Sequence, residues 1–150
     1  MAEEPLGTVV LQPSVRLVFT ISRWKGRQYA NVRKYVATAK YEGPTKSGLA
    51  MTAEVLVSVI EALQRLQGEV TRVTDQEFAR ISKRSEVDIV VSTVAPDDVQ
   101  SLPNVDIREF LNSADYTGPT KKGIRFPWQK LPEVIAVMQT QDDSFGGIEG

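Results

Sequence analysis

Basic and aromatic side chains alternate along one segment of this chain and are its first candidates for chemistry. The cluster Arg23-Trp24-Lys25-Gly26-Arg27 reads as a turn, and the strand-like run after it carries Arg33 and Tyr35 at alternate positions. Alternate residues of a strand point to the same face, so Arg33 and Tyr35 would look outward together. Lysine and arginine pair with phosphates, and aromatic rings stack on unpaired bases at about 1–3 kcal/mol per base. The pattern therefore predicts a surface for single-stranded nucleic acid with little sequence preference.

The same residue types recur in the second half of the chain. Over both halves, the candidate nucleic-acid-binding residues are Arg23, Trp24, Lys25, Arg27, Arg33, Tyr35, Lys46, Arg108, Phe110, Lys121, Lys122 and Arg125. Each has a structural alternative. Trp24 would pack beside its hairpin, Tyr35 or Phe110 would belong to the core, and the basic strand would be an ordinary solvated face. Composition alone does not decide between these interpretations.

Composition excludes most catalytic chemistry. The chain has no cysteine and no histidine, so it lacks a thiol or Ser-His nucleophile pair, disulfides and the usual zinc site. The sequence shows no clustered Asp/Glu motif for magnesium. Its Gly-Pro-Thr-Lys loops also lack the Gly-x4-Gly-Lys-Ser/Thr pattern of a phosphate-binding loop. We therefore expect no enzyme activity, no catalytic residue, no metal and no cofactor.

The near-neutral charge hides an asymmetry between the two halves. Residues 1–75 hold ten Lys/Arg and seven Asp/Glu, a balance of +3, whereas residues 76–150 hold eight and twelve, a balance of −4. A basic face is therefore compatible with the formal net charge of −1. No apolar run approaches the roughly 20 residues that span a bilayer, and the acidic start of the chain lacks the apolar stretch of a secretory signal.

A motif in the first half returns in the second. Tyr41-Glu42-Gly43-Pro44-Thr45-Lys46-Ser47-Gly48 reappears, 75 residues later, as Tyr116-Thr117-Gly118-Pro119-Thr120-Lys121-Lys122-Gly123. Upstream, the run Asn31-Val32-Arg33-Lys34-Tyr35 matches Asp106-Ile107-Arg108-Glu109-Phe110 in the same register. Shared motif, spacing and hydrophobic pattern indicate two units related by a pseudo-two-fold axis within one chain.

Each unit reads as four strands followed by a helix. In the first unit, period-two alternation and turn residues predict strands at 8–11, 15–21, 28–40 and 48–51, and a period near 3.6 predicts a helix at 55–66 capped by Thr52. In the second unit the strands fall at 78–82, 87–94, 105–114 and 122–126, and the helix at 129–139. We expect a linker at 71–76 and a disordered acidic tail from about residue 141. The fold class is α+β, with two β-β-β-β-α repeats, 1–75 and 76–150, forming an intramolecular pseudo-dimer of curved antiparallel sheets.

These segments resemble the family of the transcriptional coactivator called positive cofactor four, over roughly residues 8–67 and 78–139. The basic cluster at 23–27 and the strand at 31–35 are similar to the family's Phe-Lys-Gly-Lys … Asp-Ile-Arg-Glu-Tyr stretch, and the strand at 106–110 is closer still. The two Gly-Pro-Thr-Lys loops resemble its Pro-Gly-Arg-Lys-Gly-Ile-Ser-Leu segment. Pro127-Trp128-Gln129-Lys130-Leu131 resembles the start of its helix.

The resemblance implies a Whirly-like fold in which two units pair into a saddle that binds single-stranded DNA or unwound duplex. Family members are usually homodimers of one unit, whereas this chain would supply both. By position, Trp24, Lys25 and Arg27 would make the stacking and phosphate contacts of the hairpin tip. Arg33 and Arg108 would be the strand arginines, and the loop lysines would be Lys46, Lys121 and Lys122.

Two departures from the family pattern predict an asymmetric saddle. The second unit has Ala95-Pro96-Asp97-Asp98-Val99 where the first has its basic tip, and Val36 and Leu111 replace a family tryptophan. We expect the first unit to be the stronger half. We also expect the two helices to pack against each other across the pseudo-two-fold axis.

The functional expectation is a single-stranded-DNA-binding accessory of transcription, replication or repair. Two alternatives stay open: an RNA-binding repeat protein of the Pur-alpha type, and a protein-interaction module that has kept the fold and lost the DNA site. Expected partners are single-stranded DNA or RNA and transcription or replication proteins, and no membrane. The pseudo-dimer would be monomeric unless an open sheet edge pairs further. Lack of cysteine fits a reducing compartment, so we expect a cytoplasmic, nucleoid-associated protein in bacteria or a nuclear one in eukaryotes.

Overall fold

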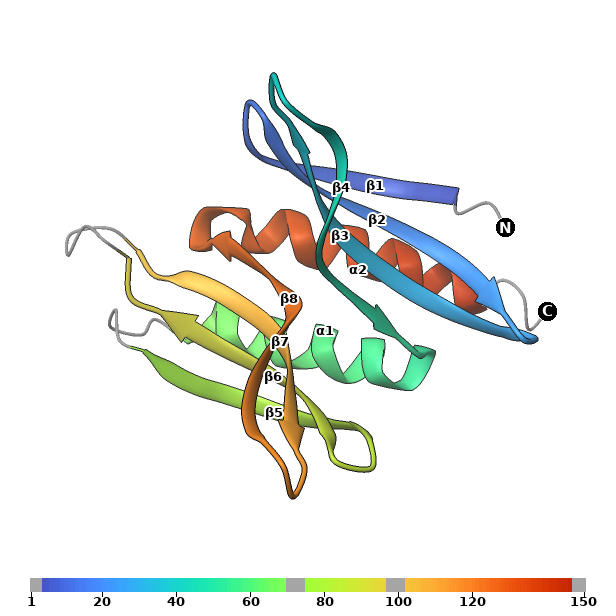
Figure 1. Ribbon diagram of the computed structural model, residues 1–150, viewed down its shortest axis with the longest axis vertical. Coiled ribbons are helices and arrows are strands. Elements are labelled where there is room, and N and C mark those ends of the chain that lie inside the picture. Colours follow the sequence, from blue (N-terminus) through green and yellow to red (C-terminus); the bar gives the residue numbers. More distant parts are fainter. Residues whose placement is uncertain (1–3, 70–74, 97–101, 147–150) are drawn as a thin grey trace.

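Two four-stranded antiparallel sheets, each followed by a helix, make up the protein (Figure 1). The computed structural model describes residues 4–69, 75–96 and 102–146. The first unit consists of β1 (Glu4–Gln12), β2 (Val15–Trp24), β3 (Arg27–Ala37), β4 (Glu42–Met51) and α1 (Ala53–Gly68). The second consists of β5 (Gln76–Arg84), β6 (Val87–Val94), β7 (Asn104–Asn112), β8 (Thr117–Pro127), a 3-10 turn η1 (Trp128–Lys130) and α2 (Leu131–Gly146). The predicted α+β fold class is confirmed.

Alternation places one face of each sheet in the core, as predicted. Leu17 and Phe19 of β2 and Val32 of β3 are fully buried, and the residues between them point to the opposite face. The helix predicted at 55–66 is present and begins where expected, because the Thr52 side chain accepts a hydrogen bond from the backbone N–H of Val55. Buried side chains of both sheets and both helices form one continuous core.

The last strand of each unit is longer than predicted. Gly43 and Pro44 fall between the strands predicted at 28–40 and 48–51, yet they lie inside β4, as Gly118 and Pro119 lie inside β8. The reason is that β4 and β8 are edge strands. A proline that lacks an N–H is tolerated on an edge, where one side of the strand makes no ladder hydrogen bonds.

The C-terminal tail was predicted wrongly. Helix α2 continues to Gly146, so disorder does not begin near residue 141. Gln141 is fully buried, and its side-chain amide donates to the backbone carbonyls of Thr20, at 2.9 Å, and Asn31, at 3.0 Å. A polar residue in a weak helical pattern thus gains its partners from strands more than 100 positions away. Of the predicted linker, residues 70–74 lie outside the described part of the chain, and Gln76 already belongs to β5.

Each helix covers the sheet of the opposite unit. Figure 1 shows α2 behind β1–β4 and α1 behind β5–β8. The contacts agree for α2, which packs on β1, β2 and β3, whereas α1 packs on β5 and β6 and also contacts β3 and β4 of its own unit. Gln141 of α2 binds β2 and β3, and the Arg65 guanidinium of α1 lies 5.6 Å from the ring centroid of Phe78 in β5. The two helices also contact each other, as expected. The prediction of one helix for each sheet is therefore correct in number, but each helix packs mainly on the sheet of the other unit.

This exchange leaves the other faces of both sheets uncovered by helices, and they open toward the same side of the molecule (Figure 1). We call these the first and second outer faces, for the sheets β1–β4 and β5–β8. At the centre, strands β4 and β8 lie against each other. No helix in the described part of the chain is long and apolar enough to cross a membrane.

The packing of α2 on β1 generates a stability prediction. A Cβ added at Gly7 would lie 2.7 Å from Cγ1 of Val137, so Gly7→Ala should destabilise the protein by about 1–3 kcal/mol through overpacking. Val137→Ala removes the clashing methyls and should make the Gly7→Ala change nearly neutral in that background. Urea unfolding followed by circular dichroism measures both free energies. Strict additivity of the two substitutions would contradict the exchanged packing.

Candidate nucleic-acid interface

The repeated Tyr-x-Gly-Pro-Thr-Lys motif shapes the hairpin that carries the loop lysines. The Tyr41 hydroxyl donates to the carbonyl of Pro44 at 2.6 Å, and the Tyr116 hydroxyl donates to that of Pro119 at 2.7 Å. The glycine between the tyrosine and the proline has a φ of 149° at Gly43 and 155° at Gly118. A Cβ added there would lie 3.1 Å from the Tyr41 hydroxyl oxygen and 2.8 Å from that of Tyr116. The motif is therefore explained by hairpin geometry and needs no bound ligand.

The strand arginines are held in the same way in both units. Arg33 donates from Nη1 to the carbonyl of Thr45 at 2.9 Å, and Arg108 donates to that of Thr120 at 3.0 Å. The register between the third and fourth strands shifts at this point. Gly123 allows the close approach, because a Cβ there would lie 2.7 Å from the carbonyl oxygen of Ile107. Each arginine thus bridges its strand to a bulge in the edge strand and lies on the outer face.

The first outer face is basic and has aromatic rings. Arg16 and Tyr35 are cross-strand partners, and the Arg16 guanidinium lies 5.3 Å from the ring centroid of Tyr35. Residues 15–37, which include β2 and β3, hold six cationic side chains and no Asp or Glu. The six are Arg16, Arg23, Lys25, Arg27, Arg33 and Lys34. Arg16, Arg27 and Arg33 lie on the outer face and Lys25 at the hairpin tip, whereas Lys34, the cross-strand partner of buried Leu17, and Arg23 lie on the opposite side of the sheet. The charge of the six is therefore not compensated within these two strands.

The hairpin between β2 and β3 projects an aromatic ring into solvent. Trp24 is 60% exposed, which rules out the alternative that it packs into the core. The Lys25 ammonium lies 4.6 Å from the centroid of that ring, and Lys25 and Gly26 both have positive φ, which closes the tight turn. An exposed ring with an adjacent cation can stack a base and meet the neighbouring phosphate.

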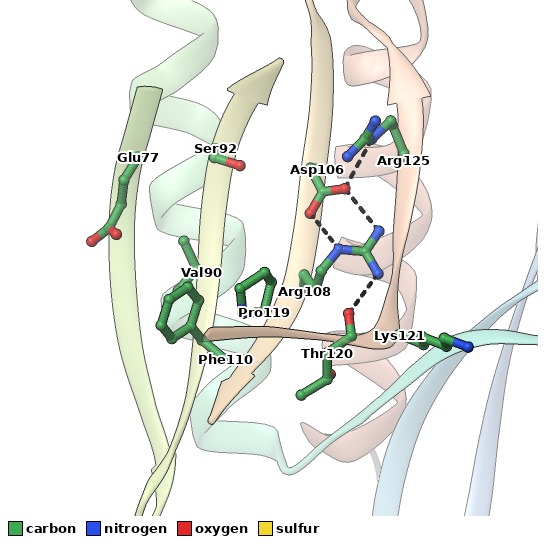
Figure 2. Close-up of a pocket in the computed structure, with 10 residues that line it drawn as sticks. All are labelled: Glu77, Val90, Ser92, Asp106, Arg108, Phe110, Pro119, Thr120, Lys121 and Arg125. Carbon is green, nitrogen blue, oxygen red and sulfur yellow. Dashed lines mark hydrogen bonds and ion pairs between the residues drawn. The ribbon is translucent and has the colours of Figure 1, made fainter. Parts of the chain in front are cut away.

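The second outer face also carries cations, including Arg80, Arg108 and Arg125, but carboxylates lie among them. Figure 2 shows its cleft of about 460 Å³, in which Asp106 lies between Arg108 and Arg125. Its carboxylate accepts two hydrogen bonds from Arg108, at 2.9 and 3.0 Å, and one from Arg125 at 3.0 Å. Phe110 lies beside the cleft's Val90 and Pro119 and is half-buried. The predicted residues Arg108, Phe110 and Arg125 therefore do meet, in a site that is largely neutralised.

A second ion-pair cluster covers the aromatic ring of this face. The Arg80 guanidinium lies 4.4 Å from the ring centroid of Phe110 and pairs with Glu77, at 2.8 Å, and Asp88, at 3.1 Å. The hydrogen bonds that Arg80 donates, first those to Glu77 and then that to Asp88, raise the pKa of Arg80 above its ordinary value. The bonds to Glu77 also lower the pKa of Glu77. A lowered carboxyl pKa stabilises the fold above the ordinary glutamate pKa and loses that effect as the pH falls through the lowered value, so Glu77 contributes this stabilisation at neutral pH.

A second cleft, of about 500 Å³, lies where the two units meet, and we call it the junction cleft. Its charged lining residues are Arg33, Lys46, Lys83, Glu109, Lys121 and Lys122. Within it Lys83 pairs with Glu109 at 2.5 Å. Lys121 lines both this cleft and that of the second outer face, and Figure 2 shows its side chain pointing away from Arg108 toward the first unit. The predicted loop lysines of both units thus converge on one basic cleft.

Sequence analysis missed several residues of this surface. Arg16 had a usable signal, because it alternates with Leu17 in a predicted strand and lies opposite Tyr35. The sequence gives no such signal for Lys83, Glu77 and Asp88, because their partners depend on how β5 is placed in the second sheet. Asp97 and Asp98 of the predicted acidic tip fall outside the described residues. In the described part of the chain, no group of three or more Asp or Glu side chains could hold a metal ion.

The bulge under Arg33 generates a second stability prediction. A Cβ at Gly48 would lie 2.8 Å from the carbonyl oxygen of Val32, so Gly48→Ala should push β4 off β3 and destabilise the protein by about 1–3 kcal/mol. Gly68→Ala is the matched control, because an added methyl there meets nothing within 4 Å. Urea midpoints compare the two. Equal midpoints would mean that the bulge adjusts without strain.

Comparison with known proteins bears on the first unit. The family model described as Transcriptional Coactivator p15 (PC4) matches residues 11–62. No curated protein sequence matches the chain at a significant level. A solved structure titled "Structure of the plant transcriptional regulator PBF-2" aligns with 99% of this chain and 85% of its own, at 8% identity and a TM-score of 0.43, too low to support a comparison of sites. The resemblance to the coactivator family is confirmed for residues 11–62, from the end of β1 into α1.

Proposed function

We propose that the protein binds single-stranded DNA with low sequence specificity, as an accessory of transcription, replication or repair. The match of residues 11–62 to the coactivator family supports this proposal. The observation that carries it is the first outer face with its hairpin tip: Arg16, Lys25, Arg27 and Arg33, with no carboxylate in residues 15–37, beside a tryptophan that is 60% exposed. Exposed cations and rings on one surface are what an unpaired strand requires.

The arrangement suggests how a strand would be held. A base would stack on Trp24, and the adjacent phosphates would meet Lys25 and Arg27 at the hairpin tip. The backbone would then follow the outer face to Arg33, whose guanidinium is exposed and anchored at Thr45. None of these contacts reads a base edge, so the binding would tolerate any sequence.

The junction cleft would continue this path into the second unit. Arg33 and Lys46 come from the first unit and Lys121 and Lys122 from the second, and all four line the same cleft. A strand that leaves Arg33 would therefore meet lysines of both units before it reaches the second outer face. We further propose that the units are tandem copies, with their boundary near residue 75, which together supply what two chains supply in a homodimer.

Removing the tip ring or its cation tests the proposal. Trp24→Ala should weaken binding of a labelled oligo-dT of about 20 nucleotides by about 1–3 kcal/mol, the cost of one lost stack, and Lys25→Ala should weaken it and flatten its salt dependence. Lys130→Ala is the control, because Lys130 lies in η1 and pairs with Glu133. Fluorescence anisotropy measures each Kd. Equal effects of Lys25→Ala and Lys130→Ala would argue against the tip.

Salt and competitors separate the alternatives. The affinity of the unchanged protein for oligo-dT should fall with salt, with a log–log slope of about −0.7 for each phosphate contact, and duplex of the same length should not displace the oligomer. Displacement by RNA of the same sequence at equal concentration would favour an RNA-binding protein. Failure to bind oligo-dT at low salt would overturn the proposed function and leave a protein-interaction module.

A further inference from the structure

One cross-strand pair beside the strand arginine differs between the two units. Asp106 of β7 lies opposite Arg125 of β8, and the corresponding cross-strand pair in the first unit is Asn31 and Ala50. The neighbouring arginines, Arg108 and Arg33, are anchored alike at the bulge carbonyl. The two sites therefore share a backbone and an arginine, and differ in one carboxylate and one guanidinium.

The carboxylate of Asp106 is built into the second outer face. The residue is only 4% exposed, and its two oxygens accept three hydrogen bonds from guanidinium groups, at 2.9–3.0 Å. Charge-assisted bonds of this bidentate kind are among the strongest that side chains make. Breaking them would leave a buried carboxylate without its partners, so the arginines are held there.

Arg108 consequently has little left to offer a ligand. Its Nε and Nη2 donate to Asp106 and its Nη1 donates to the Thr120 carbonyl, so every nitrogen of the guanidinium is already bonded. Its side chain is 22% exposed. Arg33 faces no carboxylate at this position, because Asn31 is uncharged and its amide donates to the Ser22 hydroxyl at 2.7 Å. The same arginine is thus occupied in one unit and exposed in the other.

The aromatic partner of Arg108 is restrained too. Phe110 lies under Arg80, which Glu77 and Asp88 hold in place. In the first unit Tyr35 lies under Arg16, and the strands β2 and β3 that carry this pair contain no acidic residue.

We propose that Asp106 is an internal counter-ion that withholds Arg108 from phosphate, so that the chain grips a single strand mainly through its first unit. This inference rests on the proposed function, and it names the residue that makes the two units of the protein unequal in binding. The family stretch also has an aspartate at this position. What distinguishes this chain is Asn31 in the first unit, together with Arg125 as a second guanidinium on the carboxylate of the second.

Exchanging the two pairs tests the inference without changing the net charge. Asp106→Asn with Arg125→Ala gives the second unit the pair found in the first, and Asn31→Asp with Ala50→Arg does the reverse. The first exchange should lower the Kd for oligo-dT and steepen the log–log salt slope by about 0.7, the value of one added phosphate contact on a single strand. The reverse exchange should raise the Kd and flatten the slope by a similar amount. Arg125→Ala alone keeps Asp106 on Arg108 and should give no gain.

Circular dichroism and urea midpoints check that each variant is folded. If the first exchange does not fold, the reverse exchange in the first unit decides the inference alone. An unchanged Kd and slope in a folded exchange variant would overturn the role of Asp106, while tight binding by the unchanged protein would leave the proposed function intact. If the unchanged protein does not bind but the first exchange does, the proposed function fails and the counter-ion role stands. Absence of binding in both overturns both.

Discussion

The structure depends on the exchange of helices between the two sheets. Because α2 packs on β1–β3 and α1 packs on β5 and β6 while also contacting β3 and β4, the buried faces of both sheets are completed by the other half of the chain. Buried Gln141 fastens this arrangement, since its amide donates to two carbonyls of the opposite unit. The single core that results fixes the relative position of the sheets, and hence the junction cleft and the shared direction of both outer faces. A basic surface formed from two units requires this rigidity.

The two units repeat the same backbone geometry, but they do not repeat the same side-chain charges. Tyrosine hydroxyls, threonine hydroxyls and strand arginines make the same hydrogen bonds to the same backbone atoms in both units. These bonds satisfy polar groups of a bulged edge strand, which any copy of the unit must do. The acidic residues at the second outer face accept from arginine side chains and replace none of these bonds to the backbone. The hairpin frame and the charge of the face it supports are therefore physically separable.

Net charge is consequently a poor guide to what this protein binds. A formal charge of −1 coexists with a segment of six cations and no carboxylate, because the acidic residues lie elsewhere or are paired with arginines. At physiological ionic strength, charges more than about 8 Å apart are largely screened from each other. A phosphate near Arg33 or Lys25 therefore responds to the side chains around it and not to acidic residues on distant helices.

Local pattern in the sequence determined most of the strands, the helix starts and the pairing of Arg33 with Tyr35 on one face, because alternation and capping act between near neighbours. It also determined the symmetry of the two hairpins, through the repeated motif. Only the tertiary structure decided that α2 extends through Gln141, that each helix covers the opposite sheet, and that Asp106 is shared by two arginines. Those outcomes depend on contacts between residues that are distant in the chain, and the hydrophobic period of a short segment does not predict such contacts. The physical reason is that burial and ion pairing are properties of a position in space, whereas periodicity is a property of the chain.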